Sequence, residues 1–172
     1  IEHHGSTKQK EKYLPNLIQG KWSVTMNLTE PHAGSDLSLI KTKAHINDSH
    51  YLIKGTKIYI THGDQDMSDN IVHLVLAKLP NSPEGVKGIS LFIVPKFYSN
   101  ENGQEIKNDI KVVSVEHKLG HSACPTCVLS FGEDKGAVGE LIGEPNQGLK
   151  AMFTMMNNAR LNVGVQGIAI SE

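Results

Sequence analysis

This chain has no excess of charge of one sign, because 17 of its 172 residues are basic and 18 are acidic. A nucleic-acid-binding surface is normally built from a basic excess, so the composition gives no support to that class of function. Cysteine is scarce as well, because the chain has 2. Two cysteines do not make the disulfide framework of a small secreted domain, and we therefore expect a reducing, cytoplasmic location.

Long apolar runs are also missing. No run approaches the roughly 20 apolar residues that a membrane-spanning helix needs. Residues 1–4 have neither the basic nor the apolar segment of a signal peptide. A hydrophobic content of 38% with 20% charged residues is typical of a globular protein rather than a disordered one.

The two ends lack the features of a complete chain. Residue 1 is not methionine, and residues 167–172 carry no helix-ending signal although the pattern before them is helical. We therefore expect a fragment of a longer protein that ends inside a helix.

Eight short runs rich in β-branched or aromatic residues predict β-strands. Glycine, asparagine, aspartate and proline separate them, and no helical pattern intervenes. The runs are residues 22–28, 41–46, 51–54, 57–60, 71–79, 89–94, 111–115 and 127–131. This organisation predicts a mainly β fold, a barrel or a sandwich, across residues 22–141.

A helix is predicted on each side of the β region. Ser6 and Gln9 have the spacing of a capping box, so a short helix should follow and stop at Pro15. A long helix should start near Asn146 and run to the end of the sequence, because apolar residues then recur at i, i+3, i+4 and i+7.

The apolar face of this second helix should lie in the core. Its members are Leu149, Met152, Phe153 and Met156. Arg160 continues the same stripe, and a buried guanidinium would need an anion as its partner.

Four segments carry the candidate chemistry. The loop of residues 28–36 follows the first predicted strand and combines hydroxyl groups, acids, a proline and a glycine, so it can aim backbone N–H groups at a ligand. On physical grounds alone, an ordinary turn with a glycine hinge fits it about as well. The other segments are residues 59–63 (Tyr-Ile-Thr-His-Gly), residues 118–131 and residues 157–160 (Asn-Asn-Ala-Arg).

Together these segments closely resemble the acyl-CoA dehydrogenase family, over nearly the whole chain. The resemblance implies the end of an N-terminal helical domain at residues 1–20, a β-barrel middle domain that binds flavin and acyl-CoA at residues 21–144, and the first helix of a C-terminal helical domain at residues 145–172. Residues 126–131 resemble the closing strand of the middle domain. Three segments resemble a larger bacterial branch of the family, which is similar to 3-methylthiopropanoyl-CoA dehydrogenases. They are residues 97–108, 133–139 and 155–160.

The resemblance implies a set of residues around FAD. Thr29 corresponds to a threonine that bonds the pyrimidine edge of the flavin, Thr61 to one that bonds flavin N5, and Tyr59 to an aromatic residue beside the flavin ring. Gly34 would permit close backbone approach. The implied flavin-binding residues are Met26, Leu28, Thr29, Gly34, Ser35, Tyr59, Ile60 and Thr61. The implied acyl-CoA contacts are Ser35, Asn157 and Arg160. Positions that depart from the family's usual residues are Asn27, His32, Leu39, Tyr59 and Asn157.

The reaction is implied by the same resemblance. In the family, a glutamate removes the α-proton of an acyl-CoA thioester, the β-hydrogen leaves as hydride to FAD, and the product is the trans-2-enoyl-CoA. That glutamate is expected beyond residue 172. Residues 1–172 alone should therefore hold part of the flavin-binding site but not the general base, and they should be inactive. An electron-transfer flavoprotein is the expected acceptor, and the full-length protein is expected to be a homo-oligomer.

Two other interpretations remain open. An acyl-CoA oxidase shares the middle domain but reoxidises its flavin with oxygen. A non-enzymatic β-barrel binding or zinc module could use four residues with metal-ligand spacing, which are His117, His121, Cys124 and Cys127. The other histidines, including His62 and His73, are scattered without such spacing and are expected at the surface or in turns.

Overall fold

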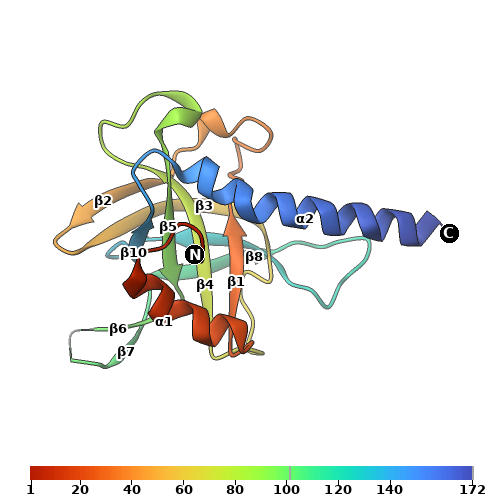
Figure 1. Cartoon of the computed structure of the whole chain (residues 1–172), viewed down its shortest axis with the longest axis horizontal. Helices are drawn as coiled ribbons and strands as arrows, with labels where there is room; N and C mark the ends of the chain where they lie inside the picture. The colour runs from red at the N-terminus through yellow and green to blue at the C-terminus, as the bar shows by residue number, and fades with distance from the viewer. Residues whose placement is uncertain (101, 172) are drawn as a thin grey trace.

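The computed structural model describes residues 1–100 and 102–171, in which a β-barrel carries two helices on one side (Figure 1). The helices are α1 (Thr7–Ile18) and α2 (Gly148–Ser171), and short 3-10 turns are η1 (Leu37–Leu39) and η2 (Gly85–Gly88). The strands are β1 (Trp22–Asn27), β2 (Lys43–Asn47), β3 (His50–Thr61), β4 (Asn70–Lys78), β5 (Ile89–Pro95), β6 (Phe97–Ser99), β7 (Glu105–Lys107), β8 (Ile110–Val115), β9 (Thr126–Phe131) and β10 (Ala137–Ile142).

Five of the strands close into a ring. Strand β4 pairs with β5, β5 with β10, β10 with β3, and β3 with β2. Strand β2 returns to β4 through the pair Lys43–Lys78, which completes the circuit. Strand β1 adds to β4 in parallel, and β9 and β8 continue outward from β3. The mainly β prediction is therefore confirmed, and of the two architectures it allowed the structure is the barrel.

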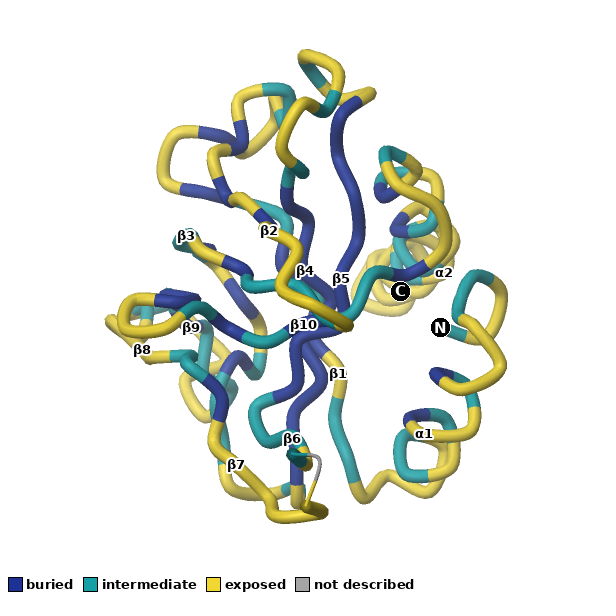
Figure 2. Tube along the Cα trace, turned by 90° about the vertical axis from the view of Figure 1, so that its left-hand side faces the viewer, coloured by how far each residue is buried: buried dark blue, intermediate teal, exposed yellow. Residues whose placement is uncertain are grey.

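Two apolar cores follow from this arrangement. One fills the barrel and includes Ile53, Val75 and Phe92. The other lies between the outer face of the barrel and the helices, where Tyr13 of α1 and Met152 of α2 are both buried. Both helices cover the same side of the sheet (Figure 2). Because β4 and β5 separate the two cores, they are buried along nearly their whole length.

Helix α1 has the predicted start but not the predicted end. The Ser6 side chain caps the Gln9 N–H and the Gln9 side chain returns to the Ser6 N–H, so the capping box is confirmed. The expected stop at Pro15 is wrong, because α1 continues to Ile18. Proline removes only its own N–H bond, whereas its carbonyl still accepts from Gln19 N–H at 3.1 Å. Packing of Leu17 against the outer core supports the last turn.

Two strand predictions also change. The runs 51–54 and 57–60 are one continuous strand, β3, because Gly55 stays extended within it. The strand predicted at residues 127–131 is present as β9, which lies outside the ring, whereas β10, which was not predicted, pairs with both β3 and β5. Strand β10 escaped the prediction because it contains a glycine and a glutamate, which are uncommon in strands. A Cβ at Gly139 would come within 3.1 Å of Val94 Cγ2, so this glycine allows tight packing.

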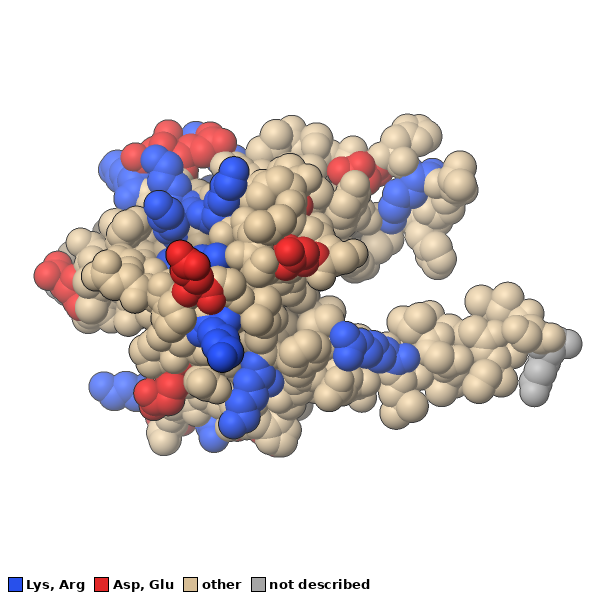
Figure 3. Space-filling view, turned by 90° about the horizontal axis from the view of Figure 1, so that it is seen from above, with Lys and Arg blue, Asp and Glu red and all other residues tan. Residues whose placement is uncertain are grey.

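Helix α2 begins on the barrel and then leaves it (Figure 1). Its first turns pack on β5, and Met152 is buried, but Phe153 is 41% exposed, so the prediction that Phe153 lies in the core is wrong. The part of α2 that projects from the barrel carries few charged side chains on the face shown in Figure 3. Neither described helix combines the length and apolarity that a membrane crossing requires.

Candidate functional site

Most of the predicted flavin-binding residues meet at one groove. An open groove of about 410 Å³ lies between the end of β1 and the end of β3, with Met155 of α2 at its side. Six of the eight predicted residues line it: Met26, Leu28, Thr29, Tyr59, Ile60 and Thr61. Gly34 and Ser35 lie further along the loop and are exposed. The groove therefore joins two sequence segments that are about 30 residues apart.

A β-bulge in β3 determines which side chains face this groove. The register of β3 against β9 shifts between Lys57 and Ile60, so both of these residues are buried although regular alternation would put them on opposite faces. As a result Tyr59 and Thr61 point outward. Tyr59 is 61% exposed and has φ of 60°, an outlier for a bulky residue. Such outliers concentrate at functional sites.

The turn after Thr61 is fixed by close packing. The His62 N–H donates to the Pro125 carbonyl at 2.7 Å, and the Gly63 N–H donates to the Ile60 carbonyl at 3.1 Å. A Cβ at Gly63 would lie 2.8 Å from the Cβ of Cys127, so only glycine fits without a shift. His62 also lines the groove, which sequence reasoning missed.

The loop of residues 28–36 is held by its own backbone. Glu30 and Ala33 exchange N–H···O bonds of 2.9 and 3.0 Å around Pro31 and His32, which makes a tight turn. Asp36 then accepts from the Ser38 N–H at 2.9 Å and caps η1. Ser35 is thereby displayed between two fixed turns.

A buried ion pair lies beneath this loop. Lys57 Nζ is 2.8 Å from Glu30 Oε1, and both side chains are at most 2% exposed. Burial lowers the pKa of Lys57 to about 8, while Lys57 and the backbone donors around Glu30 hold the pKa of that carboxyl below its usual range despite its own burial. Both groups are therefore charged at neutral pH. Sequence reasoning missed this pair, although a lysine at an inward position of an alternating strand was a usable signal.

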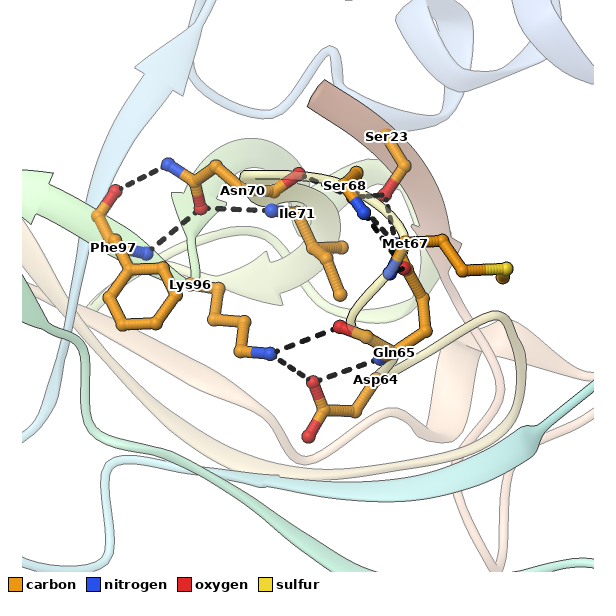
Figure 4. A network of polar contacts seen from close by, with 9 residues as sticks. All are labelled: Ser23, Asp64, Gln65, Met67, Ser68, Asn70, Ile71, Lys96 and Phe97. Carbon is orange, nitrogen blue, oxygen red and sulfur yellow. Dashed lines mark hydrogen bonds and ion pairs between the residues drawn. The ribbon is translucent and has the colours of Figure 1, made fainter. Parts of the chain in front are cut away.

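A polar network anchors the chain as it leaves the groove (Figure 4). Lys96 Nζ pairs with Asp64 Oδ1 directly after the Gly63 turn. The Asn70 side chain accepts from the Phe97 N–H at 3.0 Å and donates to the Phe97 carbonyl at 2.8 Å. The return from the groove to β4 is thus fixed to the neighbouring segment.

A second polar chain lies inside the barrel near the groove. His73 Nδ1 is 2.7 Å from Thr25 Oγ1, and Asn27 Nδ2 donates to the same hydroxyl at 2.8 Å. His73 is 1% exposed, so the prediction that it lies at the surface or in a turn is wrong. Burial lowers its pKa to about 3, and the imidazole is therefore neutral at physiological pH.

The predicted acyl-CoA contacts on α2 lie outside the groove. Arg160 is exposed, stacks on the Phe153 ring at 5.5 Å and approaches Asn157 Oδ1 at 3.5 Å. The expected buried guanidinium is therefore wrong, because α2 has left the barrel at this point. The role of Asn157 and Arg160 toward acyl-CoA stays a prediction.

The four residues with zinc-like spacing do not form a metal centre. Within residues 1–100 and 102–171, no three His, Cys, Asp or Glu side chains are grouped to hold a metal ion. His117 and His121 are exposed, whereas Cys127 is buried in the barrel core. Burial raises the pKa of the Cys127 thiol, which keeps it protonated. The arrangement of these four described residues therefore gives no geometric support to the zinc alternative.

The groove suits a flat ligand with polar edges. Tyr59 offers an aromatic face, Met26, Leu28 and Ile60 supply apolar surface, and Thr29 and Thr61 supply hydroxyl donors. Aromatic, apolar and hydroxyl groups thus lie side by side along one groove at the rim of the barrel.

Comparison with known proteins identifies the family. The profile described as "Acyl-CoA dehydrogenase, middle domain" matches residues 25–133. The chain therefore belongs to the acyl-CoA dehydrogenase family, as its sequence motifs predicted.

Individual relatives agree with this assignment. The chain is 55% identical to 3-methylmercaptopropionyl-CoA dehydrogenase of Ruegeria pomeroyi over 170 residues, which cover 98% of this chain and 28% of the relative. It is 45% identical to a butyryl-CoA dehydrogenase of Syntrophomonas wolfei, with 95% and 28% covered. The crystal structure of acyl-CoA dehydrogenase from Geobacillus kaustophilus matches with a TM-score of 0.74 at 29% identity, over 94% of this chain and 39% of that one. The chain thus spans about 28% of the length of these two curated relatives.

Proposed function

We propose that this chain is the flavin- and acyl-CoA-binding middle part of an FAD-dependent acyl-CoA dehydrogenase, which oxidises an acyl-CoA thioester to the trans-2-enoyl-CoA. The observation that carries the proposal is the groove, where residues 26–29 of the β1 end and residues 59–61 of the β3 bulge meet. Residues 21–144 would form the middle domain, with residues 1–20 and 145–172 belonging to the helical domains on either side.

The residues at the groove fit a flavin. The exposed Tyr59 ring would lie beside the ring system, Thr61 would donate to its N5 edge, and Thr29 would donate to its pyrimidine edge. FAD, when bound, would accept the hydride that leaves the β-carbon of the substrate. The contribution of this chain is to bind and orient the ring, while the exposed loop around Gly34 and Ser35 would reach the acyl-CoA.

The substrate and the partners of the whole protein are part of the same proposal. A short-chain acyl-CoA is the proposed substrate class, because the names of both curated relatives specify short acyl groups. An electron-transfer flavoprotein is the proposed acceptor, and a homo-oligomer the proposed assembly. The cytoplasmic location stays a prediction.

Anaerobic titration of the intact, flavin-loaded protein tests the proposal. We expect butyryl-CoA and 3-methylmercaptopropionyl-CoA to bleach the flavin absorbance, with CoA alone as the control. A colourless protein, or a flavin that neither thioester reduces, would contradict it. Fast reoxidation by air after reduction would instead indicate an acyl-CoA oxidase.

A further inference from the structure

The ion pair of Glu30 and Lys57 occupies a position that packing alone does not explain. It lies in the barrel wall, and replacing a buried ion pair by apolar residues of similar volume is often neutral or stabilising. What the charged pair supplies is a set of directional bonds. Lys57 Nζ donates to Glu30 Oε1 at 2.8 Å and to the Leu28 carbonyl at 2.9 Å.

The carboxylate oxygens of Glu30 also accept several hydrogen bonds. Its Oε2 accepts from the Lys41 N–H at 2.7 Å, and its Oε1 accepts from both the N–H and the hydroxyl of Thr42. The pair therefore joins three stretches of chain, and a fully satisfied polar network of this kind favours one geometry over its neighbours.

Two of the three stretches that it joins form the two sides of the groove. Leu28 and Glu30 flank Thr29, while Lys57 directly precedes the bulge that presents Tyr59 and Thr61. A third tie lies between them, since the Ile58 N–H donates to the Thr29 carbonyl at 2.9 Å. The distance between the two groove segments is thus set by contacts at Lys57 and Ile58.

We propose that Glu30 and Lys57 are positioning residues, whose ion pair holds the Thr29 segment and the Tyr59–Thr61 segment in the relative placement that flavin binding requires. This inference rests on the proposed function. Neither residue touches the groove itself, so they act through Leu28, Thr29 and the bulge.

The decisive variant is the intact protein with Glu30→Gln and Lys57→Met together, which removes both charges and leaves no buried charge unpaired. A control is Lys12→Met with Glu140→Gln, because this partly exposed ion pair joins α1 to β10 and neither residue lines the groove. Circular dichroism and thermal unfolding report the fold. Equilibrium dialysis with FAD and the visible flavin spectrum report the site.

We expect the Glu30–Lys57 variant to keep its fold, to bind FAD at least tenfold more weakly and to show an altered flavin spectrum, while the control retains both properties. Unchanged FAD affinity and spectrum in the folded variant would overturn the inference. If the unaltered protein bound no FAD, the proposed function itself would fail. If it bound FAD and was bleached by acyl-CoA, only the positioning role would be at stake.

A second variant decides the case in which the double variant does not fold. Thr42→Val removes one donor to Glu30 Oε1, keeps both charges and preserves the side-chain shape. We expect it to fold and to bind FAD about threefold more weakly with a shifted spectrum. FAD binding and a spectrum equal to those of the unaltered protein would overturn the inference.

Discussion

Thr61 is the residue whose side chain reports most directly on the proposed chemistry. In the intact protein, Thr61→Val should leave the barrel stability unchanged within about 0.5 kcal/mol, because the residue is exposed. It should slow flavin reduction by acyl-CoA, because loss of one donor at a site of developing charge costs about 2–4 kcal/mol at most. Stopped-flow measurement of flavin bleaching at saturating acyl-CoA checks this.

Thr29→Val is the companion variant at the other edge of the groove. It should weaken flavin binding or shift its reduction potential rather than act at the hydride-accepting edge. Equal bleaching rates and flavin contents in both variants and in the unaltered protein would show that these threonines are ordinary turn residues.

Tyr59 combines an exposed ring with a strained backbone, and the two properties can be separated. Because φ is 60° at this position, any residue with a side chain has a conformational strain energy of about 1–2 kcal/mol there, whereas glycine does not. We expect Tyr59→Gly to be more stable than Tyr59→Ala by roughly 1 kcal/mol, and both to bind FAD more weakly because the ring is lost. Urea unfolding and FAD dialysis of the two variants test this. Equal stability of the variants would mean that the bulge relaxes when the ring is removed.

At the scale of the element, the turn of residues 60–63 depends on the absence of a side chain at Gly63. Gly63→Ala would place a Cβ 2.8 Å from Cys127 Cβ and 3.0 Å from the Ile60 carbonyl. We expect a loss of about 1–3 kcal/mol in the free energy of unfolding, since neither neighbour is the end of a flexible side chain. Gly120→Ala is the control, because a Cβ there would meet no atom within 4 Å. Equal unfolding midpoints for the two variants would contradict the packing argument.

Helices and strands were predictable from the sequence where neighbouring residues along the chain determine them, and not where tertiary contacts do. The capping box of α1 and the β-branched runs of β4 and β5 are local signals, and the start of α1 and these two strands appear as predicted. Strand β10 and the continuation of α1 through Pro15 depend on tertiary contacts, namely the pairing of β10 with β3 and β5 and the packing of Leu17. A single sequence does not show such contacts.

The site follows the same division. Thr29, Tyr59 and Thr61, which the family resemblance predicted to contact the flavin, lie together at one groove. Their role toward a flavin stays a prediction. The bulge, the buried pair of Glu30 and Lys57, and the burial of His73 were not predicted. Each results from the way β3 or β4 sits in the closed ring, which the local pattern of residues does not specify.

At the scale of the whole molecule, the barrel contains buried groups that make it sensitive to acid. His73 is neutral when folded, with its pKa lowered by burial to about 3, but in the unfolded chain it takes up a proton near its ordinary value of 6.5. Between those two values the unfolded state binds more protons than the folded state, so stability falls as pH falls. The slope attributable to His73 approaches about 1.4 kcal/mol per pH unit. Glu30 adds to the loss below its ordinary pKa of 4.5, since its folded pKa is lowered by Lys57 and by backbone donors.

We therefore expect the free energy of unfolding to decrease steadily from pH 6.5 toward pH 4. Trp22, the single tryptophan of the chain, packs beside Tyr13 and gives a fluorescence signal for urea titrations at each pH. His73→Gln keeps a polar group near Thr25 but cannot take up a proton, so it should flatten the profile between pH 6.5 and pH 5. Below that range both proteins should lose stability, because Glu30 is still present. If the unaltered protein and the variant had parallel profiles from pH 6.5 to pH 5, His73 would not be the group that gives the barrel its acid sensitivity.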